Sequence, residues 1–353
     1  MKMKTIAAAA SLMALPALSF AAAPTLGDVL GASGITASGH ASAGFFYQKT
    51  TPPSPAPKVT ANSFTFDQAE LMFAKTPADG FGATVDIFAG QDVAGGGAPF
   101  APAFNKFGAG GEVNLHQAFV QYSSGGLTVV GGKFATLAGS EVASDAANVN
   151  ATRSLLFGFQ PLTLTGVRAG YKFGDMITAY AGLSNAVGGA TVDFNKQKTT
   201  ELGVALTPAT GVTVALTDYI GNELPGGGQK TNLLDLVAGF TAGPLSLGLN
   251  ADYQTVKTNA VTNQKNSGVA LYANFQVVPA FRAGVRAEAT TAKDTVPVPN
   301  TKFKANEFTL TGDYTAASNF DVLGDLRFDQ MKNDVTGAKT KLTTFLVKGI
   351  YKF

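Results

Sequence analysis

The sequence of 353 residues contains no cysteine and no tryptophan, and it has only two histidines. Without cysteine, a disulfide scaffold, a thiolate zinc site, an iron–sulfur cluster and a cysteine nucleophile are all excluded. Two histidines leave little room for an imidazole metal site or for histidine-based catalysis. No segment has the spacing of a calcium loop or of a complete phosphate-binding loop. We therefore expect no cofactor and no enzymatic chemistry.

Charge is also scarce, because charged residues make up 14% of the chain, against about 25% in a typical soluble domain. Apolar residues make up 45%, which excludes a disordered chain. Removing Lys2 and Lys4, which belong to the leader described next, takes the 26 basic residues to 24, equal to the 24 acidic ones. A neutral chain of this kind is not expected to bind nucleic acid.

The N-terminus has the pattern of a secretory signal peptide, which we assign to residues 1–22. Two lysines precede an apolar stretch from about Ile6 to Phe20, and small residues follow with the spacing of a cleavage site near Ala21 or Ala22. An uncleaved membrane anchor is the alternative. No other apolar run approaches the roughly 18–20 residues that a transmembrane helix needs. Residues 23–34 then form a short segment in the periplasm or the lumen, before the first strand.

From residue 34 onward the hydrophobic period is two, not 3.6. In Leu245–Gln254, for example, apolar residues alternate strictly with polar or small ones, which predicts a strand with one apolar and one polar face. We count about sixteen such segments, although the pattern is also compatible with 14 or 18. Their approximate limits are 35–47, 64–75, 81–89, 113–122, 127–134, 162–173, 176–184, 199–207, 212–220, 232–241, 245–255, 268–277, 281–290, 306–315, 320–330 and 342–353.

The connections between these segments alternate in length. Short ones such as 76–80, 123–126 and 242–244 are separated by long ones such as 90–112 and 135–161. Outer-membrane barrels have this asymmetry, with short periplasmic turns, long external loops and an even number of antiparallel strands. A secreted β-sandwich or β-helix also has period-two strands, but sixteen segments with alternating connections fit it poorly. We therefore predict a transmembrane antiparallel β-barrel over residues 35–353.

The chain ends in LTTFLVKGIYKF, which places Phe345, Val347, Gly349, Tyr351 and Phe353 on one face. Tyr351 and Phe353 are positioned for the aromatic girdle of a membrane barrel. They also match the terminal aromatic signal that the outer-membrane assembly machinery binds, so this machinery is an expected partner.

Several stretches of the first half resemble the OmpL-like β-barrel porins of Gram-negative bacteria. These are PTLGDVLGASGITASGHASAGF (24–45), FDQAELMFAKTPADGFGATVDIFAG (66–90), QAFVQYSSGGLTVVGGKFATLAGSEV (117–142) and RSLLFGFQPLTLTGVRAGYKF (153–173). The second half is similar only in its general barrel pattern. The resemblance implies an outer-membrane channel and says little about what it carries.

The longest connection, 135–161, is by parity the third external loop. In porins generally the third loop folds into the barrel and narrows the pore, and the resemblance implies that role here. The constriction residues would be Glu141, Asp145 and Arg153, facing a basic set formed by Arg168, Lys172, Arg282, Arg286 and Arg327. Opposed charges across a narrow point would orient polar solutes. A loop that lies over the barrel mouth without a filter role is the alternative, and the ion preference stays open.

The expected function is therefore that of a porin in the outer membrane, which lets small hydrophilic solutes or ions diffuse through a water-filled pore. A closed structural or surface-recognition barrel, such as an adhesin or receptor, is the second hypothesis. An outer-membrane lipid hydrolase would require His40 or His116 for its activity and is the third. Expected partners are outer-membrane lipid, lipopolysaccharide, the solutes and, by analogy with general porins, two further copies in a homotrimer.

Overall fold

The computed structural model describes residues 26–90, 113–188, 192–223, 228–258, 262–294 and 301–353. It divides into two units, residues 1–35 and residues 36–353, which are described separately. In the first unit, helix α1 (Leu26–Ser33) lies within the segment predicted for 23–34. The predicted signal peptide, 1–22, lies outside the described residues. No helix in the described part is long and apolar enough to cross a membrane.

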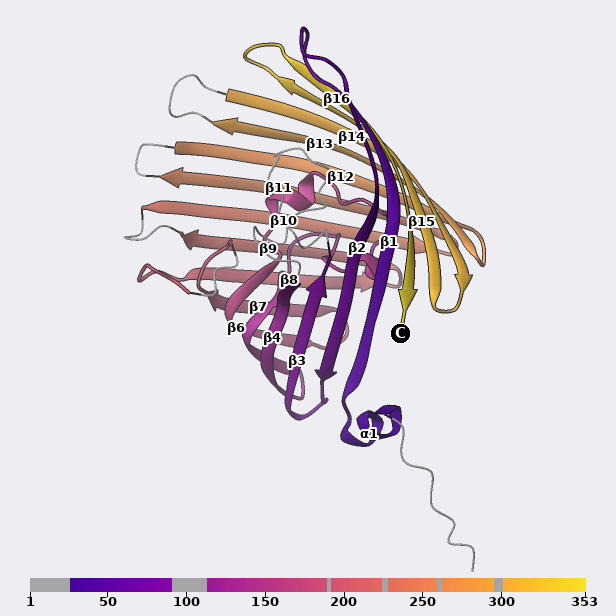
Figure 1. The fold of residues 1–353 in the computed structure, drawn as a ribbon. Helices are drawn as coiled ribbons and strands as arrows, with labels where there is room; N and C mark the ends of the chain where they lie inside the picture. The colour runs from indigo at the N-terminus through magenta and orange to yellow at the C-terminus, as the bar shows by residue number, and fades with distance from the viewer. Residues whose placement is uncertain (1–25, 91–112, 189–191, 224–227, 259–261, 295–300) are drawn as a thin grey trace, which may run out of the picture. The chain divides into compact units, whose positions relative to one another are not determined.

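The second unit is a closed barrel of sixteen antiparallel strands, as predicted (Figure 1). Each strand pairs with its neighbours in sequence, and β1 pairs with β16 to close the barrel. The strands are β1 (Thr36–Thr51), β2 (Val59–Lys75), β3 (Gly80–Ala89), β4 (Val113–Ser124), β5 (Leu127–Ala135), β6 (Thr163–Phe173), β7 (Ile177–Ser184), β8 (Thr199–Ala209), β9 (Val212–Asn222), β10 (Gln229–Ala242), β11 (Leu245–Thr258), β12 (Thr262–Val278), β13 (Phe281–Asp294), β14 (Thr301–Ala317), β15 (Phe320–Asn333) and β16 (Lys339–Lys352).

The two rims of the barrel differ. At the short-turn rim, connections of a few residues join the strands, and glycines with positive φ such as Gly174 and Gly243 let the chain reverse there. At the long-loop rim the connections are longer. The wall formed by β10–β16, β1 and β2 has strands of 14–17 residues. The wall formed by β3–β9 has strands of 8–12 residues.

Several strands extend further toward the long-loop rim than the sequence pattern predicts. β14 begins at Thr301 instead of 306, and β12 begins at Thr262 instead of 268. The added residues include Lys302, Lys304 and Lys265, so apolar and polar residues do not alternate there. Backbone pairing continues beyond the apolar part of the wall because the ladder does not depend on side-chain polarity. Hydrophobic periodicity therefore detects only the apolar part of each strand.

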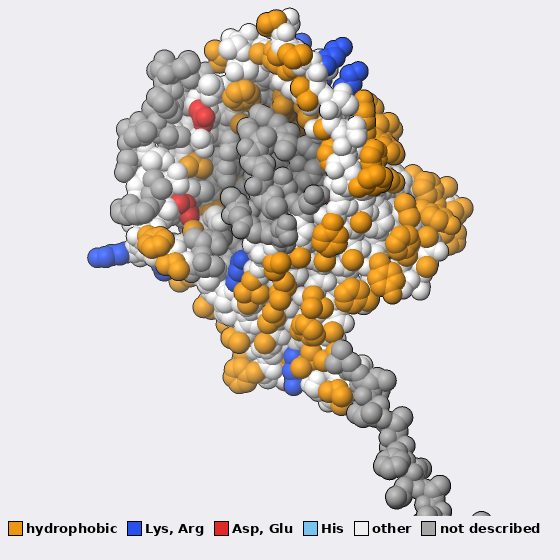
Figure 2. Space-filling view, in the orientation of Figure 1, with side chains coloured by type: hydrophobic (Ala, Val, Ile, Leu, Met, Phe, Trp, Pro, Cys, Tyr) orange, Lys and Arg blue, Asp and Glu red, His pale blue; other side chains and the backbone are white. Residues whose placement is uncertain are grey.

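The outward and inward faces of the barrel have opposite chemistry. Outward side chains are apolar and exposed, including Leu247, Leu271, Phe308 and Phe328. Figure 2 shows hydrophobic side chains covering much of the visible outer surface. Aromatic residues such as Phe281 and Tyr314 lie on this face near the short-turn rim. Inward side chains include many buried Asp, Glu, Arg and Thr residues. A soluble sandwich would have the reverse arrangement, whereas a barrel surrounded by lipid requires this one.

The last residue of the chain completes the seam between β1 and β16. The Phe353 and Gly39 backbones exchange two N–H···O bonds of 3.0 Å. A Cβ at Gly39 would overlap the Glu70 carbonyl oxygen and the Phe353 ring, so glycine is required there. Tyr351 and Phe353 lie exposed on the outward face, where the sequence pattern placed them.

Candidate functional site

The connection between β5 and β6, residues 136–162, folds into the barrel lumen (Figure 1). It contains two short 3₁₀ helices, η1 (Asp145–Ala147) and η2 (Leu156–Phe159). The base of this lumen loop is closed by a hydrogen bond of 3.1 Å from the Thr136 N–H to the Leu162 carbonyl. Its side chains and backbone then hydrogen-bond to residues of nine strands, β9–β11, β13–β16, β1 and β2.

Tyr219 of β9 holds the first turn of the lumen loop. Its hydroxyl accepts the Leu137 N–H at 2.9 Å and shares a second hydrogen bond of 2.9 Å with the Thr136 hydroxyl. The Tyr219 ring belongs to a buried apolar cluster that also contains Ala138 of the loop and Leu233 of β10. The loop therefore leaves β5 toward the lumen because both apolar burial and hydrogen bonds favour that path.

Arg286 of β13 connects the middle of the lumen loop to the barrel wall. Its Nη1 donates to the Glu141 carboxylate and to the Thr152 carbonyl, both at 2.7 Å. On the barrel wall its Nε donates to the Glu307 carboxylate at 3.1 Å. The Arg286 side chain is 0% exposed. A guanidinium in this position is stabilised only while all of its partners stay in place.

Asp145 forms a second attachment of the lumen loop, at β16, β1 and β2. Its carboxylate accepts hydrogen bonds from Lys348 at 2.9 Å and from Ser42 at 2.8 Å, and it pairs with Arg153 of the loop at 3.0 Å. The Asp145 N–H donates to the Gln68 amide oxygen at 2.9 Å. Burial alone would raise the pKa of the Asp145 carboxyl, but the Lys348 ammonium and the Arg153 guanidinium lower it well below its usual range.

Arg153 and Arg327 connect these two attachments. Arg153 donates to the carbonyls of Val142 and Ala143, at 2.9 and 2.8 Å, and so holds the two limbs of the lumen loop together. Arg327 of β15 donates to the Arg153 carbonyl and pairs with Asp329 at 2.7 Å. The basic side chains of this region therefore bind the loop and the wall instead of projecting into open lumen.

Several carboxylates of the wall bind backbone N–H groups of the lumen loop. Asp235 accepts the Gly139 N–H at 3.0 Å, and Asp325 accepts the Thr152 N–H at 2.7 Å. Glu288 accepts the N–H groups of Leu155 and Leu156 at 2.6 and 3.0 Å. The sequence shows these acids on the polar face of their strands, but it has no signal that pairs them with a loop far away in the chain.

The eight predicted constriction residues separate into two groups. Glu141, Asp145, Arg153, Arg286 and Arg327 come together in the network described above. Arg168 lies elsewhere, paired with Glu201 at 2.7 Å and placed 4.4 Å above the Phe134 ring. Arg282 pairs with Asp313, and Lys172 pairs with Asp175 at 3.0 Å with its side chain 57% exposed, both near the short-turn rim. The expected opposition of charges across a gap is thus replaced by direct ion pairs.

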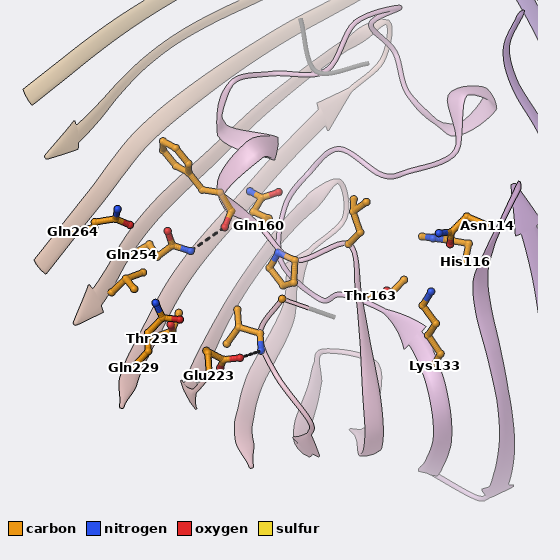
Figure 3. Close-up of a pocket in the computed structure, with 16 residues that line it drawn as sticks. Asn114, His116, Lys133, Gln160, Thr163, Glu223, Gln229, Thr231, Gln254 and Gln264 are labelled. Carbon is orange, nitrogen blue, oxygen red and sulfur yellow. Dashed lines mark hydrogen bonds between the residues drawn. The ribbon is translucent and has the colours of Figure 1, made fainter. Parts of the chain in front are cut away.

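Pockets lie on both sides of the lumen loop. The pocket on the long-loop side has a volume of about 650 Å³ (Figure 3). Amide side chains of Gln229, Gln254 and Gln264 line one wall of this pocket, and His116 and Lys133 lie across from them. The pocket on the short-turn side has a volume of about 550 Å³, and Val149 of the loop and Arg282 line it. Within the described ranges, no group of three or more Asp, Glu or His residues could hold a metal ion.

A closed sixteen-strand barrel with an apolar outward face, a polar lumen and an inserted loop defines the class of outer-membrane porins. The sequence model of one such family, described as "Putative beta-barrel porin-2, OmpL-like", matches residues 34–353. The chain belongs to this family, and its place is the outer membrane. No curated protein sequence matches the chain significantly.

Solved outer-membrane proteins have the same fold at low sequence identity. The channel DcaP of Acinetobacter baumannii has a TM-score of 0.63 at 11% identity, over 90% of this chain and 97% of its own. The loop L8 deletion mutant of OmpT from Vibrio cholerae has a TM-score of 0.61 at 12% identity, over 91% and 100%. OprB of Pseudomonas putida has a TM-score of 0.60 at 13% identity, over 92% and 96%. At such identities the likeness shows the fold alone.

Proposed function

We propose that the protein is a passive porin, through which small hydrophilic solutes or ions diffuse along a water-filled path narrowed by the lumen loop. The carrying observation is that residues 136–162 lie inside the barrel, attached to strands on both walls, with a pocket on each side. A sixteen-strand barrel is wide enough for an aqueous channel. Family membership and the fold shared with a protein named as a channel support this proposal.

The charges of the lumen support a hydrated interior. Carboxylates such as Asp86, Asp235 and Asp325 face inward and accept hydrogen bonds from neutral donors. Burying an ion in a dry protein interior costs several kcal/mol even after relaxation. Water in the pockets beside the loop would lower that cost, because it screens and solvates the carboxylates.

We also propose that the pore prefers cations. Six basic residues of the wall and the lumen loop are matched by six acids: Arg168 by Glu201, Arg282 by Asp313, Arg286 by Glu307 and Glu141, Arg327 by Asp329, and Arg153 and Lys348 by Asp145. The inward carboxylates that accept only neutral donors in the described contacts add negative charge to this balanced set. A lumen with excess negative charge raises the local concentration of cations.

Single-channel current in a planar bilayer tests both proposals. We expect discrete conductance steps, and in a salt gradient a reversal potential of the sign that cation preference gives. A variant lacking residues 140–150 should have a larger conductance, because those residues narrow the path. An unchanged conductance would refute the role of the loop as a constriction. If folded protein gave no conductance steps and caused no swelling of sugar-loaded liposomes, we would conclude that it is a closed structural or recognition barrel.

Further parts of the proposal concern export and assembly in a Gram-negative envelope. We propose that residues 1–22 are a cleaved signal peptide, and that Tyr351 and Phe353 are bound by the assembly machinery. Lipopolysaccharide is a proposed partner of the outward face, and no enzymatic activity is proposed. OmpT of Vibrio cholerae has been solved in a trimer form, which supports a homotrimer here. Crosslinking of the protein in native membranes, followed by sizing, tests the trimer.

A further inference from the structure

Ten lysines lie on the outward face of the barrel at the long-loop ends of β10–β16 and β1. Eight are exposed and two, Lys302 and Lys332, are half-buried. We call this set the lysine belt, and its members are Lys49, Lys230, Lys257, Lys265, Lys293, Lys302, Lys304, Lys332, Lys339 and Lys341. None of the ten lies on β3–β9. In Figure 2 basic side chains project at the upper edge of the visible face, beyond the apolar surface.

The strand register places many of these lysines directly opposite each other. Lys230 is the cross-strand partner of Lys257. Lys293 has Lys265 as its partner on one side and Lys302 on the other. Like charges in directly opposite positions destabilise a sheet.

The same pattern is repeated two strands further on. Lys332 lies between Lys304 on β14 and Lys339 on β16. The belt thus contains five directly opposed lysine pairs along consecutive strands. Bound anions would stabilise such an arrangement, because they neutralise the opposed charges.

The protein itself supplies little of this neutralisation. Within the described part of the chain, Asp334 is the carboxylate in every ion pair that the belt makes. It lies 3.0 Å from Lys304, 3.1 Å from Lys332 and 3.8 Å from Lys302. Hydrogen bonds from Lys304 and Lys332 lower the pKa of the Asp334 carboxyl, so it carries its charge at neutral pH. One carboxylate leaves most of the belt without an anionic partner from the chain.

The belt lies at the polar edge of the apolar outward face. On β14 the outward residues run from Lys304 through Asn306 to the exposed Phe308 and Leu310. On β11 they run from Lys257 through Thr255 to the exposed Tyr253. A tyrosine at this level is typical of the membrane–water interface. The head groups of the surrounding lipid therefore lie at the level of the ammonium groups.

We propose that the lysine belt is a binding site for the phosphate groups of phosphorylated lipids in the outer leaflet, with lipopolysaccharide as the occupant. Lysine ammonium groups bind phosphate as point charges, and basic residues near an anionic lipid surface each add to the attraction. The proposal specifies the lipid partner named above. It depends on the outer-membrane location and not on the presence of an open pore.

Neutralising part of the belt tests the proposal. The belt variant carries Lys257→Gln, Lys293→Gln and Lys304→Gln. A matched control carries three exposed lysines outside the belt as glutamine, Lys58→Gln, Lys75→Gln and Lys196→Gln, with the same change in net charge. Folded proteins in neutral detergent are titrated with lipopolysaccharide, with the same lipid after removal of its phosphates, and with inorganic phosphate. Native mass spectrometry counts the lipid molecules retained.

We expect wild type and control to bind phosphorylated lipid equally, and the belt variant to bind at least about tenfold more weakly. Removing the lipid phosphates should weaken wild-type binding to a similar degree, a comparison that needs no variant. Inorganic phosphate alone should bind weakly. Equal binding by belt variant and wild type, equal binding of dephosphorylated lipid, or equally tight binding of free phosphate would overturn the proposal. The conductance of the belt variant in neutral lipid should match wild type, so this test is separate from that of the pore.

Discussion

Neutralising Asp145 should release the β16 end of the lumen loop. Asp145→Asn keeps the size of the side chain but removes the charge that Lys348 and Arg153 share, at 2.9 and 3.0 Å. Both cations are buried, and Lys348 also lies 3.5 Å from the Asp67 carboxylate. Removing one partner of a buried ion pair costs about 3–5 kcal/mol. That cost falls on the inserted state of the loop, since a withdrawn loop would let all of these groups meet water.

Single-channel recording measures this shift. A bias of about 3–5 kcal/mol toward withdrawal changes the ratio of inserted to withdrawn loops by about two to four orders of magnitude. We expect a larger mean conductance or frequent transitions to a larger level. Asp175→Asn is the matched control, because Asp175 pairs with Lys172 on the short-turn rim and its side chain is 99% exposed. Such a surface pair contributes little.

If the Asp145→Asn variant gave the same conductance level and the same current noise as wild type, Asp145 would not hold the loop. The pH dependence gives a second check. Because the pKa of Asp145 is lowered in the folded protein, its stabilisation is present above the unfolded pKa and is lost as the pH falls through the folded value. Wild-type conductance should therefore show no effect of this group between pH 7 and about pH 5.

Three further substitutions have defined outcomes. Gly139 has a φ of +93°, and a Cβ there would overlap the Gln160 amide, so Gly139→Ala should loosen the loop and cost about 1–3 kcal/mol, seen as added current noise. Arg286→Met removes the buried cation that pairs with both Glu141 and Glu307 and should lower the free energy of unfolding in lipid by about 3–5 kcal/mol, measured by urea titration. Burial raises the pKa of the Glu223 carboxyl; its ionised form is therefore disfavoured, and Glu223→Gln should stabilise the protein at neutral pH but not in acid.

Most of the barrel could be predicted from the sequence, because lipid imposes a simple rule on each strand. The outward residues of Leu245–Gln254 must be apolar and the inward ones face water, so the period of two is visible without any structure. The parts missed were strand ends such as those at Thr262 and Thr301. They extend past the apolar band, where the backbones still pair but the sequence no longer alternates between apolar and polar residues.

The lumen loop was harder to predict in detail. Its charged residues and those of the wall were visible, but which charges meet depends on the path of the loop through the barrel. Tyr219 and Gly139, which set that path, have no charge and no periodic signal. Arg168 and Arg286 occupy equivalent inward positions on their strands, yet only Arg286 reaches the middle of the loop.

The net charge of the whole chain conceals how basic and acidic residues are distributed between the outer surface and the lumen. After the two leader lysines are removed, acidic and basic residues are equal in number, so composition alone indicates no preference for any ion. The closed barrel places those charges in two separate environments. The lysine belt faces the lipid head groups outside, and carboxylates such as Asp86 and Asp235 face the lumen. The charges of the belt lysines therefore do not contribute to the lining of the lumen. An anionic lipid outside and a cation-preferring path inside are therefore two separate consequences of the same partition: lipid titration tests the first, and the sign of the reversal potential tests the second.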